Sequence, residues 1–549
     1  VRSSAASDVY KRQVMKRINL KRIAAAVIAV SSVFVGVYGS TVPSAAEPDE
    51  YHDDWLHVNE NAEIVDMYGN PVWLTGCNWF GYNVGSQVFD GVWSRNMHEM
   101  LTEIADHGFN LLRVPMSTQL LLQWKNNEPD PATPKINEWT NPELTVEGVV
   151  GGKVKYSFDV WNQAVEWCRE LGIKIMIDIH SAETASAGHQ VSLWYTDKYS
   201  TEDWYEALEW LTDYYKDDDT LIAIDLKNEP HGKADVPSQM AKWDDSKDPN
   251  NWKYAAECAA EKVLAINPNL LIMVEGIEVY PKEGYDWTAP AKDWTTNTEF
   301  YYGAWWGGNF RGAKENPIDL GEHQSQLVYS PHDYGPLVYE QSWFHEGFTQ
   351  ESIMEEYWYD NWFYLLEEKT APLLMGEWGG FIDEQHDPDG ANTKWLTCLR
   401  DLMIENRIHH TFWCFNENSG DTGGLVYDNF GTWDEDKYAL VKPALWQDEN
   451  GKFISLDHKF AIGANGISLS DYYSGEQPTL PSESIDTLIK GDVNNDKKVN
   501  IFDSVVLKRF VAGIETDIDK NNADFNSDGN IGISDSVSYT HLRAHETLS

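Results

Sequence analysis

A short apolar run that ends in Asn228, Glu229 and Pro230 places a carboxylate where it could act as a proton donor. Residues 221–226 suffice for a strand but are too few for a helix. Pro230 has no amide hydrogen to give to a sheet, so strand pairing should end before it. Glu229 is then expected at the carboxyl end of a strand. The segment alone would also suit the start of a helix with proline at its first position.

A general acid of this kind works with a second carboxylate placed opposite it. Three carboxylates follow other apolar runs, namely Asp178, Glu275 and Glu377. Glu377 is flanked by glycines, which leave space for a ring-shaped substrate to approach. Glu275 has nearly the same surroundings, so the residues alone leave the choice between Glu377 and Glu275 open.

Eight apolar runs along the chain are predicted to be strands, and they lie at residues 72–79, 109–114, 173–180, 221–226, 270–274, 327–332, 372–376 and 408–415. Helical patterns with apolar residues at i, i+3 and i+4 separate most of them, for example at residues 94–105, 160–170, 255–266, 353–366 and 393–404. This alternation predicts an α/β fold, a (β/α)8 TIM barrel, whose strand ends meet on one active face. A small hairpin at residues 56–65 is expected ahead of it.

Two acidic segments near the end of the chain repeat a pattern that suits a hard cation. Oxygen ligands at positions 1, 3, 5 and 12 of a twelve-residue loop, with a carbonyl at position 7, bind calcium. The predicted ligands are Asp492, Asn494, Asp496, Lys498 and Asp503 in the first loop and Asp524, Asn526, Asp528, Asn530 and Asp535 in the second. We therefore expect two Ca²⁺ ions here and no cofactor for catalysis. Position 12 is Asp rather than the Glu of an EF-hand, and Lys497 replaces the usual Gly.

The composition excludes some partners and favours others. The formal net charge of −46 opposes binding to nucleic acid or anionic membranes, both of which need basic patches. The 25 tryptophans and 27 tyrosines suit ordinary core packing as well as a cleft that stacks flat substrates. Five scattered cysteines argue against a zinc site and a disulfide framework, although one pair, Cys77 with Cys414, stays open because the first and last strands of a barrel are neighbours.

The first residues predict an export signal. Residues 15–46 contain a basic start, an apolar run at 23–38 and small residues that would suit cleavage. A membrane anchor is the alternative, but the apolar run is short. Residues 1–14 and 539–549 resemble translated assembly junctions and are not expected to belong to the fold.

Motifs spread over residues 55–450 resemble glycoside hydrolase family 5, and within it the bacterial endoglucanase branch, subfamily 1. They lie at residues 73–81, 112–115, 178–180, 228–231, 305–309, 329–334, 376–379 and 411–413. The resemblance implies a retaining barrel with Glu229 as acid/base and Glu377 as nucleophile, and it selects Glu377 over Glu275.

The resemblance also implies how the site is built. The predicted substrate-binding residues are Arg113, His180, Asn228, His332, Tyr334, Trp413, Trp79, Trp194, Trp306 and Gln341. Arg113 and the Tyr334 hydroxyl should keep Glu377 ionised. The pKa of Glu229 should rise from about 4.3 toward about 6–7 so that it arrives protonated. Asn228 is expected to bind the sugar 2-hydroxyl, and the tryptophans are expected to stack on sugar rings, with Trp413 as the floor of the site.

The calcium repeat resembles a type I dockerin, the module that attaches enzymes to a cohesin domain of a scaffoldin. Ile501, Phe502, Ile533 and Ser534 match its cohesin contacts, and the helix expected after the second loop is missing. The predicted domains are a catalytic barrel at 50–460, a linker at 461–486 and a truncated dockerin at 487–538.

Taken together, these features predict a secreted, cellulosome-associated, retaining endo-β-1,4-glucanase with a monomeric catalytic domain. Its expected partners are β-1,4-glucan and a cohesin, with no nucleic acid and no membrane after signal removal. Mannan, xyloglucan and mixed-linkage glucan remain alternative substrates. A non-catalytic carbohydrate-binding barrel is disfavoured because both Glu229 and Glu377 are present.

Overall fold

The computed structural model describes residues 54–128, 135–232, 239–290, 299–474, 493, 501–511, 518, 520–524 and 530–532. The predicted signal at 15–46 and the junction-like ends at 1–14 and 539–549 lie outside these residues. Among the described helices, none is long and apolar enough to cross a membrane.

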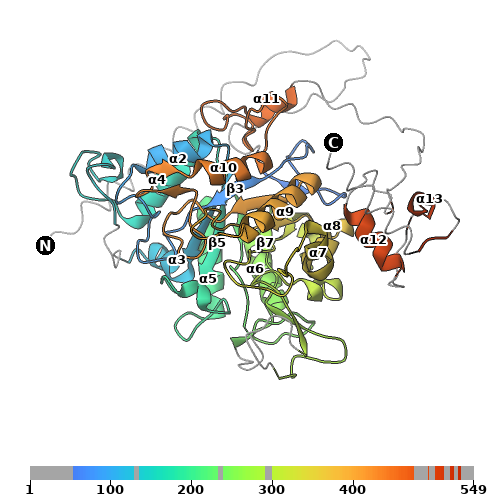
Figure 1. The fold of residues 1–549 in the computed structure, drawn as a ribbon. Helices are drawn as coiled ribbons and strands as arrows, with labels where there is room; N and C mark the ends of the chain where they lie inside the picture. Colours follow the sequence, from blue (N-terminus) through green and yellow to red (C-terminus); the bar gives the residue numbers. More distant parts are fainter. Residues whose placement is uncertain are drawn as a thin grey trace, which may run out of the picture. The chain divides into compact units, whose positions relative to one another are not determined.

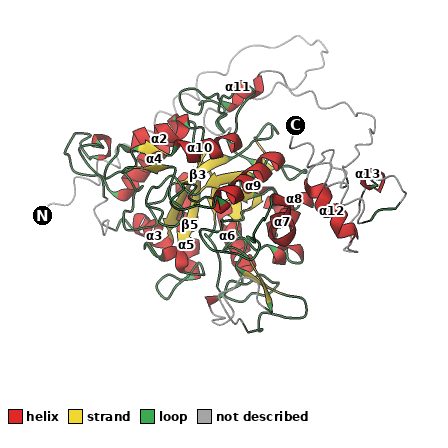
Figure 2. Ribbon diagram, viewed as in Figure 1, coloured by secondary structure: helices red, strands yellow, loops and turns green. Residues whose placement is uncertain are grey.

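Eight parallel strands form the predicted barrel, with helices around it (Figures 1 and 2). They are β3 Thr75–Asn78, β4 Leu111–Ser117, β5 Lys174–Ser181, β6 Leu221–Asp225, β7 Leu271–Val274, β10 Leu327–Tyr329, β11 Leu374–Met375 and β12 His409–Phe412. Each pairs with its neighbour along the chain except β10 and β11, which are joined only by isolated bridges, and β12 pairs with β3. The prediction of a (β/α)8 barrel is confirmed.

The barrel closes at a seam between β10 and β11. Two bridges, Tyr329 with Leu373 and His332 with Glu377, join these strands where the paired ladder is absent among the described residues. Amide hydrogen bonds run from Tyr329 to the Pro372 carbonyl and from Asp333 to the Glu377 carbonyl, at 3.1 Å each. The seam therefore ends at the position of the predicted nucleophile.

The helices lie between the strands in sequence, as their apolar periodicity predicted. They are α2 Met97–Asp106, α3 Thr118–Lys125, α4 Ser157–Glu170, α5 Thr201–Tyr215, α6 Trp252–Ile266, α7 Gln350–Ile353, a π-helical segment Met354–Phe363, α8 Tyr364–Glu367, α9 Ala391–Asn406 and α10 Glu435–Val441. Their starts follow local chemistry. In α5, Ser200 and Asp203 cap each other's backbone amides reciprocally, which satisfies donors that the first turn leaves unpaired.

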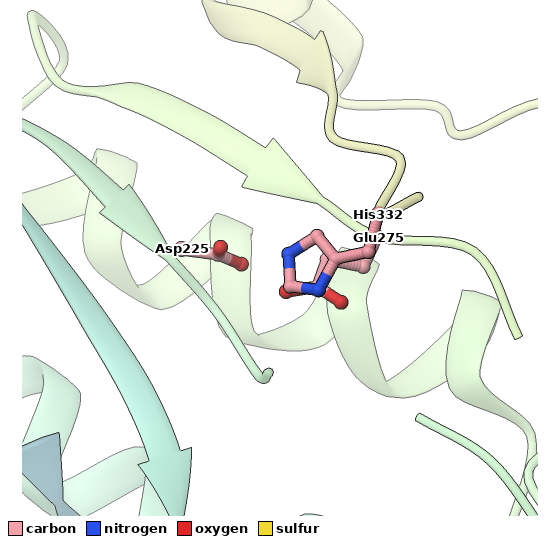
Figure 3. Close-up of side chains that lie close together, drawn as sticks. All are labelled: Asp225, Glu275 and His332. Atoms are coloured by element: carbon pink, nitrogen blue, oxygen red, sulfur yellow. The ribbon is translucent and has the colours of Figure 1, made fainter. Parts of the chain in front are cut away.

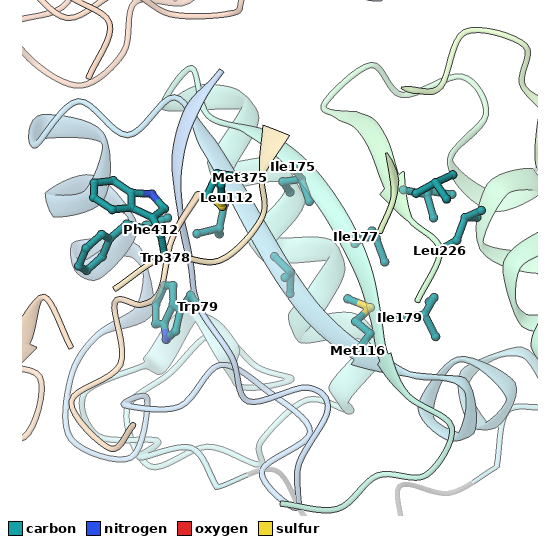
Figure 4. Packing of buried hydrophobic residues seen from close by; sticks show 14 of the residues in the cluster. Trp79, Leu112, Met116, Ile175, Ile177, Ile179, Leu226, Met375, Trp378 and Phe412 are labelled. Atoms are coloured by element: carbon teal, nitrogen blue, oxygen red, sulfur yellow. The ribbon is translucent and has the colours of Figure 1, made fainter. Parts of the chain in front are cut away.

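The strand β5 shows how the barrel separates packing from chemistry. All its residues are buried, as is usual for parallel strands covered on both faces. Ile175, Ile177 and Ile179 lie on one side of the strand in the large apolar cluster that includes the helices (Figure 4). The period of two then assigns Lys174, Met176, Asp178 and His180 to the other side. This inward row carries the polar residues of the strand.

Three hairpins accompany the barrel. The predicted one pairs β1 His57–Val58 with β2 Ile64–Val65. The other two are β8 Val279–Pro281 with β9 Tyr301–Gly303 and β13 Val426–Tyr427 with β14 Thr432–Trp433. The segment between β7 and β10 thus contains a pair of antiparallel strands. All five cysteines are free thiols, so Cys77 and Cys414 are unpaired here.

The predicted linker boundary at residue 461 was wrong. Ile454 pairs with Ile467, and Leu469 is fully buried at the start of α11 Leu469–Ser474. The Tyr473 hydroxyl donates to the Pro71 carbonyl. The barrel domain therefore continues to Ser474. Glycine and serine around these isolated apolar residues gave the segment the composition of a linker, and residues 475–486 lie outside the described part.

The described dockerin residues contain α12 Ile501–Val511 and α13 Lys520–Ala523. They pack around Val493, Leu507, Ile518 and Ala523, which are buried. Of the predicted calcium ligands, Asp503, Asp524 and Asn530 are described. Those at Asp492, Asn494, Asp496, Lys498, Asn526, Asp528 and Asp535, and the cohesin candidates Ile533 and Ser534, lie outside the described residues.

Candidate active site

Glu229 and Glu377 come together at the carboxyl ends of β6 and β11. One carboxylate oxygen of each and a ring nitrogen of His332 all lie within 4.8 Å of one another. Carboxyl groups about 5–5.5 Å apart suit double displacement at a sugar carbon, whereas about 6.5–9.5 Å leaves room for an attacking water. A distance of 4.8 Å or less between the nearest oxygens is compatible with the shorter of these two spacings. The structure thus brings together the two residues that were predicted to be catalytic.

Two donors hold the Glu377 carboxylate in place. Arg113 Nη1 donates to its Oε1 at 2.9 Å, and the Tyr334 hydroxyl donates to its Oε2 at 2.6 Å. Both contacts match the arrangement expected from the sequence. They hold the Glu377 carboxylate at the end of β11, near that of Glu229 at the end of β6.

Arg113 is the centre of a buried charge cluster. Its guanidinium is fully buried on the inward side of β4. Besides Glu377, it donates to Asp225 Oδ2 at 2.9 Å and to Glu275 Oε1 at 3.2 Å, and it lies 3.3 Å from Asp178 Oδ2. We call these five residues the Arg113 cluster. One cation therefore orients four carboxylates from four different strands.

His332 lies between the two predicted catalytic glutamates. Its Nδ1 is 3.0 Å from Glu229 Oε1 and 3.7 Å from Glu377 Oε2, and its Nε2 is 3.2 Å from Glu275 Oε1. Burial lowers the pKa of His332, but Glu275, Glu377 and Glu229 around it raise that pKa well above its usual range. A proton is therefore held on His332, within hydrogen-bond distance of Glu229.

The pKa directions of the two glutamates differ from the sequence-based expectation. Burial raises the pKa of Glu229, but the hydrogen bond and charge of His332 outweigh burial and lower it to about 2. Burial raises the pKa of Glu377 against the opposing charges of His332 and Arg113. The expected pattern, raised at Glu229 and lowered at Glu377, was wrong because His332 donates to Glu229. Sequence spacing did not reveal which carboxylate the imidazole would face.

The two glutamates line a cavity of about 580 Å³. The other predicted residues that line it are His180, Trp306, Tyr334, Gln341 and Trp413. Arg113, Asn228 and His332 lie behind this wall and are buried. Asn228 accepts from Arg113 Nη2 at 2.9 Å, while its Nδ2 has no hydrogen-bond partner among the described residues. That amide is an unpaired donor next to Glu229 in the chain, behind the wall of the cavity.

Flat side chains form two faces of the cavity. Trp413 lies nearly parallel to His180, with ring centres 5.6 Å apart, and nearly parallel to Phe80 at 5.7 Å. Trp306 stacks on His231 at 3.7 Å. His180 is itself oriented by Asp178, 2.6 Å from its Nδ1. The cavity can therefore hold flat rings between aromatic faces.

Two of the predicted stacking residues lie outside the cavity, which corrects their assignment. Trp79 is fully buried, stacks on Phe89 at 4.1 Å and donates its indole N–H to the Asp90 carbonyl. Trp194 is 1% exposed and packs among Trp204 and Trp252. Both belong to the core. The prediction failed because a position beside a strand end does not reveal which way the ring points.

The same clusters could hold a metal ion by distance alone. Ligand atoms of Asp225, Glu275 and His332 lie within 4.8 Å of one another (Figure 3). The Arg113 guanidinium, however, already donates to both Asp225 and Glu275. A protein cation, the Arg113 guanidinium, therefore already pairs with the carboxylates that a metal ion would bind.

Sequence reasoning missed several residues around the site. Phe80 lines the cavity and stacks on Trp413, and Asp225 binds Arg113 from within β6. Asn78 accepts from Arg113 Nη1 at 3.0 Å. A charged residue inside the apolar run at 221–226 was the available signal for Asp225. Phe80 carried no signal, because an aromatic residue after a strand usually packs in the core.

Comparison with known families gives two matches. Residues 65–419 match Cellulase (glycosyl hydrolase family 5), and residues 490–538 match the dockerin type I domain. The first match covers the barrel and both predicted catalytic glutamates. The second covers the calcium repeat.

Two similar relatives come from Acetivibrio thermocellus. Endoglucanase G is 49% identical over 505 residues, which cover 86% of this chain and 88% of that protein. Endoglucanase B is 42% identical over 542 residues, covering 92% and 94%.

Solved structures agree with the fold. An endocellulase variant from Pyrococcus horikoshii in complex with cellotetraose has a TM-score of 0.60 and 30% identity, covering 71% of this chain and 98% of that one. The catalytic domain of the major endoglucanase from Xanthomonas campestris has a TM-score of 0.58 and 28% identity, covering 71% and 99%.

Proposed function

This chain belongs to glycosyl hydrolase family 5, and we propose that it is an endo-β-1,4-glucanase that cleaves internal bonds of cellulose-type glucan with retention of configuration. The observation that carries the proposal is the pair Glu229 and Glu377, whose nearest oxygens lie within 4.8 Å in a cavity with aromatic faces. The endoglucanases G and B, similar over most of their length, support the choice of β-glucan.

The first step transfers the sugar to the enzyme. Glu377, fixed by Arg113 and Tyr334, attacks the anomeric carbon with one carboxylate oxygen. Glu229 gives a proton to the glycosidic oxygen as the C–O bond breaks. The proton comes from the pair formed with His332, whose Nδ1 lies 3.0 Å from Glu229. A substrate that covers the cavity excludes water from Glu229, which favours its neutral form and draws the proton from the imidazole.

The second step releases the sugar. Glu377 is now an ester and has lost its charge, which removes one of the anions around His332 and Glu229. Glu229 takes a proton from a water molecule, the hydroxyl oxygen bonds to the anomeric carbon from the side that the leaving group vacated, and the ester bond to Glu377 breaks, which returns the Glu377 carboxylate. Two inversions at one carbon give net retention.

The remaining residues bind the sugar. Trp413 and Trp306 offer ring faces, and Tyr and Trp suit sugars because they combine an apolar face with a polar group. The Asn228 amide, which has no partner among the described side chains and backbone, donates to the 2-hydroxyl of the sugar in the transition state.

The test is hydrolysis of carboxymethyl-cellulose and of glucomannan, measured as reducing ends released by the wild type and by Glu377→Gln. We expect the wild type to act faster on carboxymethyl-cellulose and Glu377→Gln to be inactive on both. Faster release from mannan would reassign the substrate. Equal, negligible release by both proteins would instead support a barrel that only binds carbohydrate.

The dockerin match supports calcium binding and attachment to a cohesin. Asp503, at position 12 of the first loop, is buried, and its Oδ1 accepts the Val493 amide at 2.6 Å. Position 12 thus folds back on the start of its own loop, as a calcium loop requires, so the residues fit the ion. With the export signal predicted at residues 15–46, the chain would act outside the cell on a scaffoldin. Chelation should abolish cohesin binding and leave hydrolysis largely intact.

A further inference from the structure

Glu275, the carboxylate that competed with Glu377 for the role of nucleophile, occupies a different place. It follows β7 and its side chain is fully buried. It does not line the cavity that Glu229 and Glu377 share. Glu275 therefore cannot reach a substrate carbon, and its contacts show what it does instead.

One oxygen of Glu275 holds the backbone of Glu229. The Glu229 amide donates to Glu275 Oε2 at 2.6 Å. Glu229 has a φ of 50°, in the left-handed region that residues with a side chain rarely adopt. A buried amide without an acceptor is costly, so this contact favours the strained backbone over its relaxed alternatives. The direction of the Glu229 side chain depends on that backbone.

The other oxygen of Glu275 faces the partner of the Glu229 side chain. Glu275 Oε1 lies 3.2 Å from His332 Nε2, while His332 Nδ1 lies 3.0 Å from Glu229 Oε1. Arg113 Nη2 donates to the same Glu275 oxygen at 3.2 Å. A single carboxylate thus contacts Glu229 at its backbone and, through the His332 ring, at its carboxyl end.

The neighbouring chain leaves space for this carboxylate. Gly307 has a φ of 72°, and a Cβ built on it would lie 2.3 Å from Glu275 Oε2. The Gly307 carbonyl also accepts the Gly276 amide at 2.8 Å. Any larger residue at 307 would push Glu275 away from the Glu229 amide.

We propose that Glu275 is a positioning residue of the acid/base, which fixes the backbone of Glu229 and the ring of His332 with the two oxygens of one carboxylate. This inference rests on the proposed function. Four charged or titratable groups surround the Glu275 carboxylate. They are Arg113 from β4, Asp225 from β6, Lys227 from the loop after β6, and His332 after β10. Among these only His332 links Glu275 to the Glu229 carboxyl.

The test compares Glu275→Gln with the wild type on carboxymethyl-cellulose across pH 4–9. An amide can accept the Glu229 N–H only by turning its own N–H₂ toward Arg113 and His332, so the constellation should loosen. We expect kcat to fall about 100-fold with KM nearly unchanged, since displacement of a catalytic group by about 1 Å costs that much. Removing an anion beside His332 also weakens its hold on the proton, so the alkaline limb of kcat/KM should move to lower pH.

Glu275→Asp separates charge from reach. It keeps the anion, so the alkaline limb should return toward that of the wild type, while kcat stays low because the shorter side chain no longer reaches the Glu229 amide. The matched control is Asp333→Asn, which replaces another buried carboxyl, next to His332 in the chain, that accepts from the Trp358 indole and does not contact Glu229. Its pH profile and kcat should stay close to those of the wild type.

Three outcomes would overturn the inference. They are an unchanged kcat and pH profile in Glu275→Gln, an equal loss in Asp333→Asn, and a loss confined to KM. If Glu275→Gln does not fold, Gly307→Ala serves instead, because it keeps every charge and its Cβ would meet the Glu275 carboxylate, and wild-type kcat in that variant would equally count against us. A wild type that releases no reducing ends from any β-glucan would instead remove the proposed function itself.

Discussion

Two buried cations stand at opposite ends of the same barrel, and their surroundings differ in one instructive respect. Arg113 lies toward the carboxyl ends of the strands, among Asp178, Asp225, Glu275 and Glu377. Lys174 begins β5 at the amino end, and we call it, with Asp54, Asp66, Asp219, Asp457 and His458, the Lys174 cluster. Both cations are buried and both are surrounded by carboxylates and a histidine.

In the Lys174 cluster the charged groups pair with one another. Lys174 Nζ lies 2.5 Å from Asp54, 3.0 Å from Asp457 and 3.7 Å from Asp219. His458 then joins Asp54 at 2.6 Å to Asp66 at 3.1 Å. These residues come from the flanks of the first hairpin, the start of β5, the turn before β6 and the segment between α10 and α11. The cluster therefore ties the two ends of the domain together.

The Arg113 cluster leaves bonding capacity unused. Asp178 Oδ1 and Asp225 Oδ1, and beside the cluster the Asn228 amide, are buried without a hydrogen-bond partner among the described residues, whereas no buried side-chain nitrogen or oxygen of the Lys174 cluster lacks one. Unpaired buried polar groups cost stability. The barrel thus pairs its buried charges fully at the amino end and leaves bonding capacity unused at the carboxyl end, where the candidate site lies, in line with the division between the two faces of such barrels.

The sharpest way to test this division is to remove the nucleophile. Glu377→Gln should lower kcat by about four orders of magnitude, the scale on which loss of a catalytic nucleophile acts. It should not reduce the free energy of unfolding, because one anion leaves a crowded cluster. Reducing-sugar assays and urea unfolding of the same preparation measure both. A large loss of stability would show that the active end also serves the fold.

Glu229→Gln should have the next largest effect, about 10³-fold on kcat with carboxymethyl-cellulose, since a general acid contributes about 10²–10⁴-fold. An aryl cellobioside with a dinitrophenolate leaving group needs no proton for the first step, so that step should stay fast and the glycosyl-enzyme should accumulate in a burst. Absence of the burst, with wild-type folding, would contradict the assignment of Glu229 as the acid.

At the other end, Lys174→Met should lower the free energy of unfolding by about 3–5 kcal/mol, because it leaves buried carboxylates without their cation. Below the melting temperature kcat should remain within about twofold of the wild type. Lys125→Met, which breaks the partly exposed ion pair with Glu206, is the matched control and should cost about 1 kcal/mol or less. A selective loss of kcat in Lys174→Met would mean that the two clusters are coupled.

The smallest effect concerns pH. Burial lowers the pKa of His458, but hydrogen bonds with Asp54 and Asp66 raise it to about 9. Since the pKa in the unfolded chain is about 6.5, this histidine stabilises the fold fully below that pH, and the contribution is lost as the pH rises through about 9. Urea unfolding between pH 6 and 10 should show that decline, and His458→Asn should flatten it. An unchanged slope in the variant would place the titration elsewhere.

The sequence was most informative where one strand carries one signal. Each apolar run that ends in a polar residue became a barrel strand, and Glu229 and Glu377 followed from that pattern together with the family resemblance. It was least informative where several strands meet. No spacing tells that His332 would donate to Glu229 or that Glu275 would turn away from the cavity, since both depend on side chains from three or four strands.

Other errors have similar causes. Trp79 and Trp194 follow or precede the right elements, yet their rings turn into the core, and direction is not encoded in position. The domain end was set too early because Ile462, Ile467 and Leu469 are isolated among small polar residues, and only the folded partner surface shows that they are buried or paired.

The seam between β10 and β11 is a place where the barrel can open locally. The hydrogen bonds across it include the amides of Tyr329, Asp333 and Gly376, and the Asp333 amide ends on the Glu377 carbonyl itself. Short ladders open more easily than long ones, and amide exchange reports such openings. Glu377, the proposed nucleophile, thus lies beside this short seam. Exchange rates at these amides therefore measure how often the seam opens and the catalytic geometry is lost.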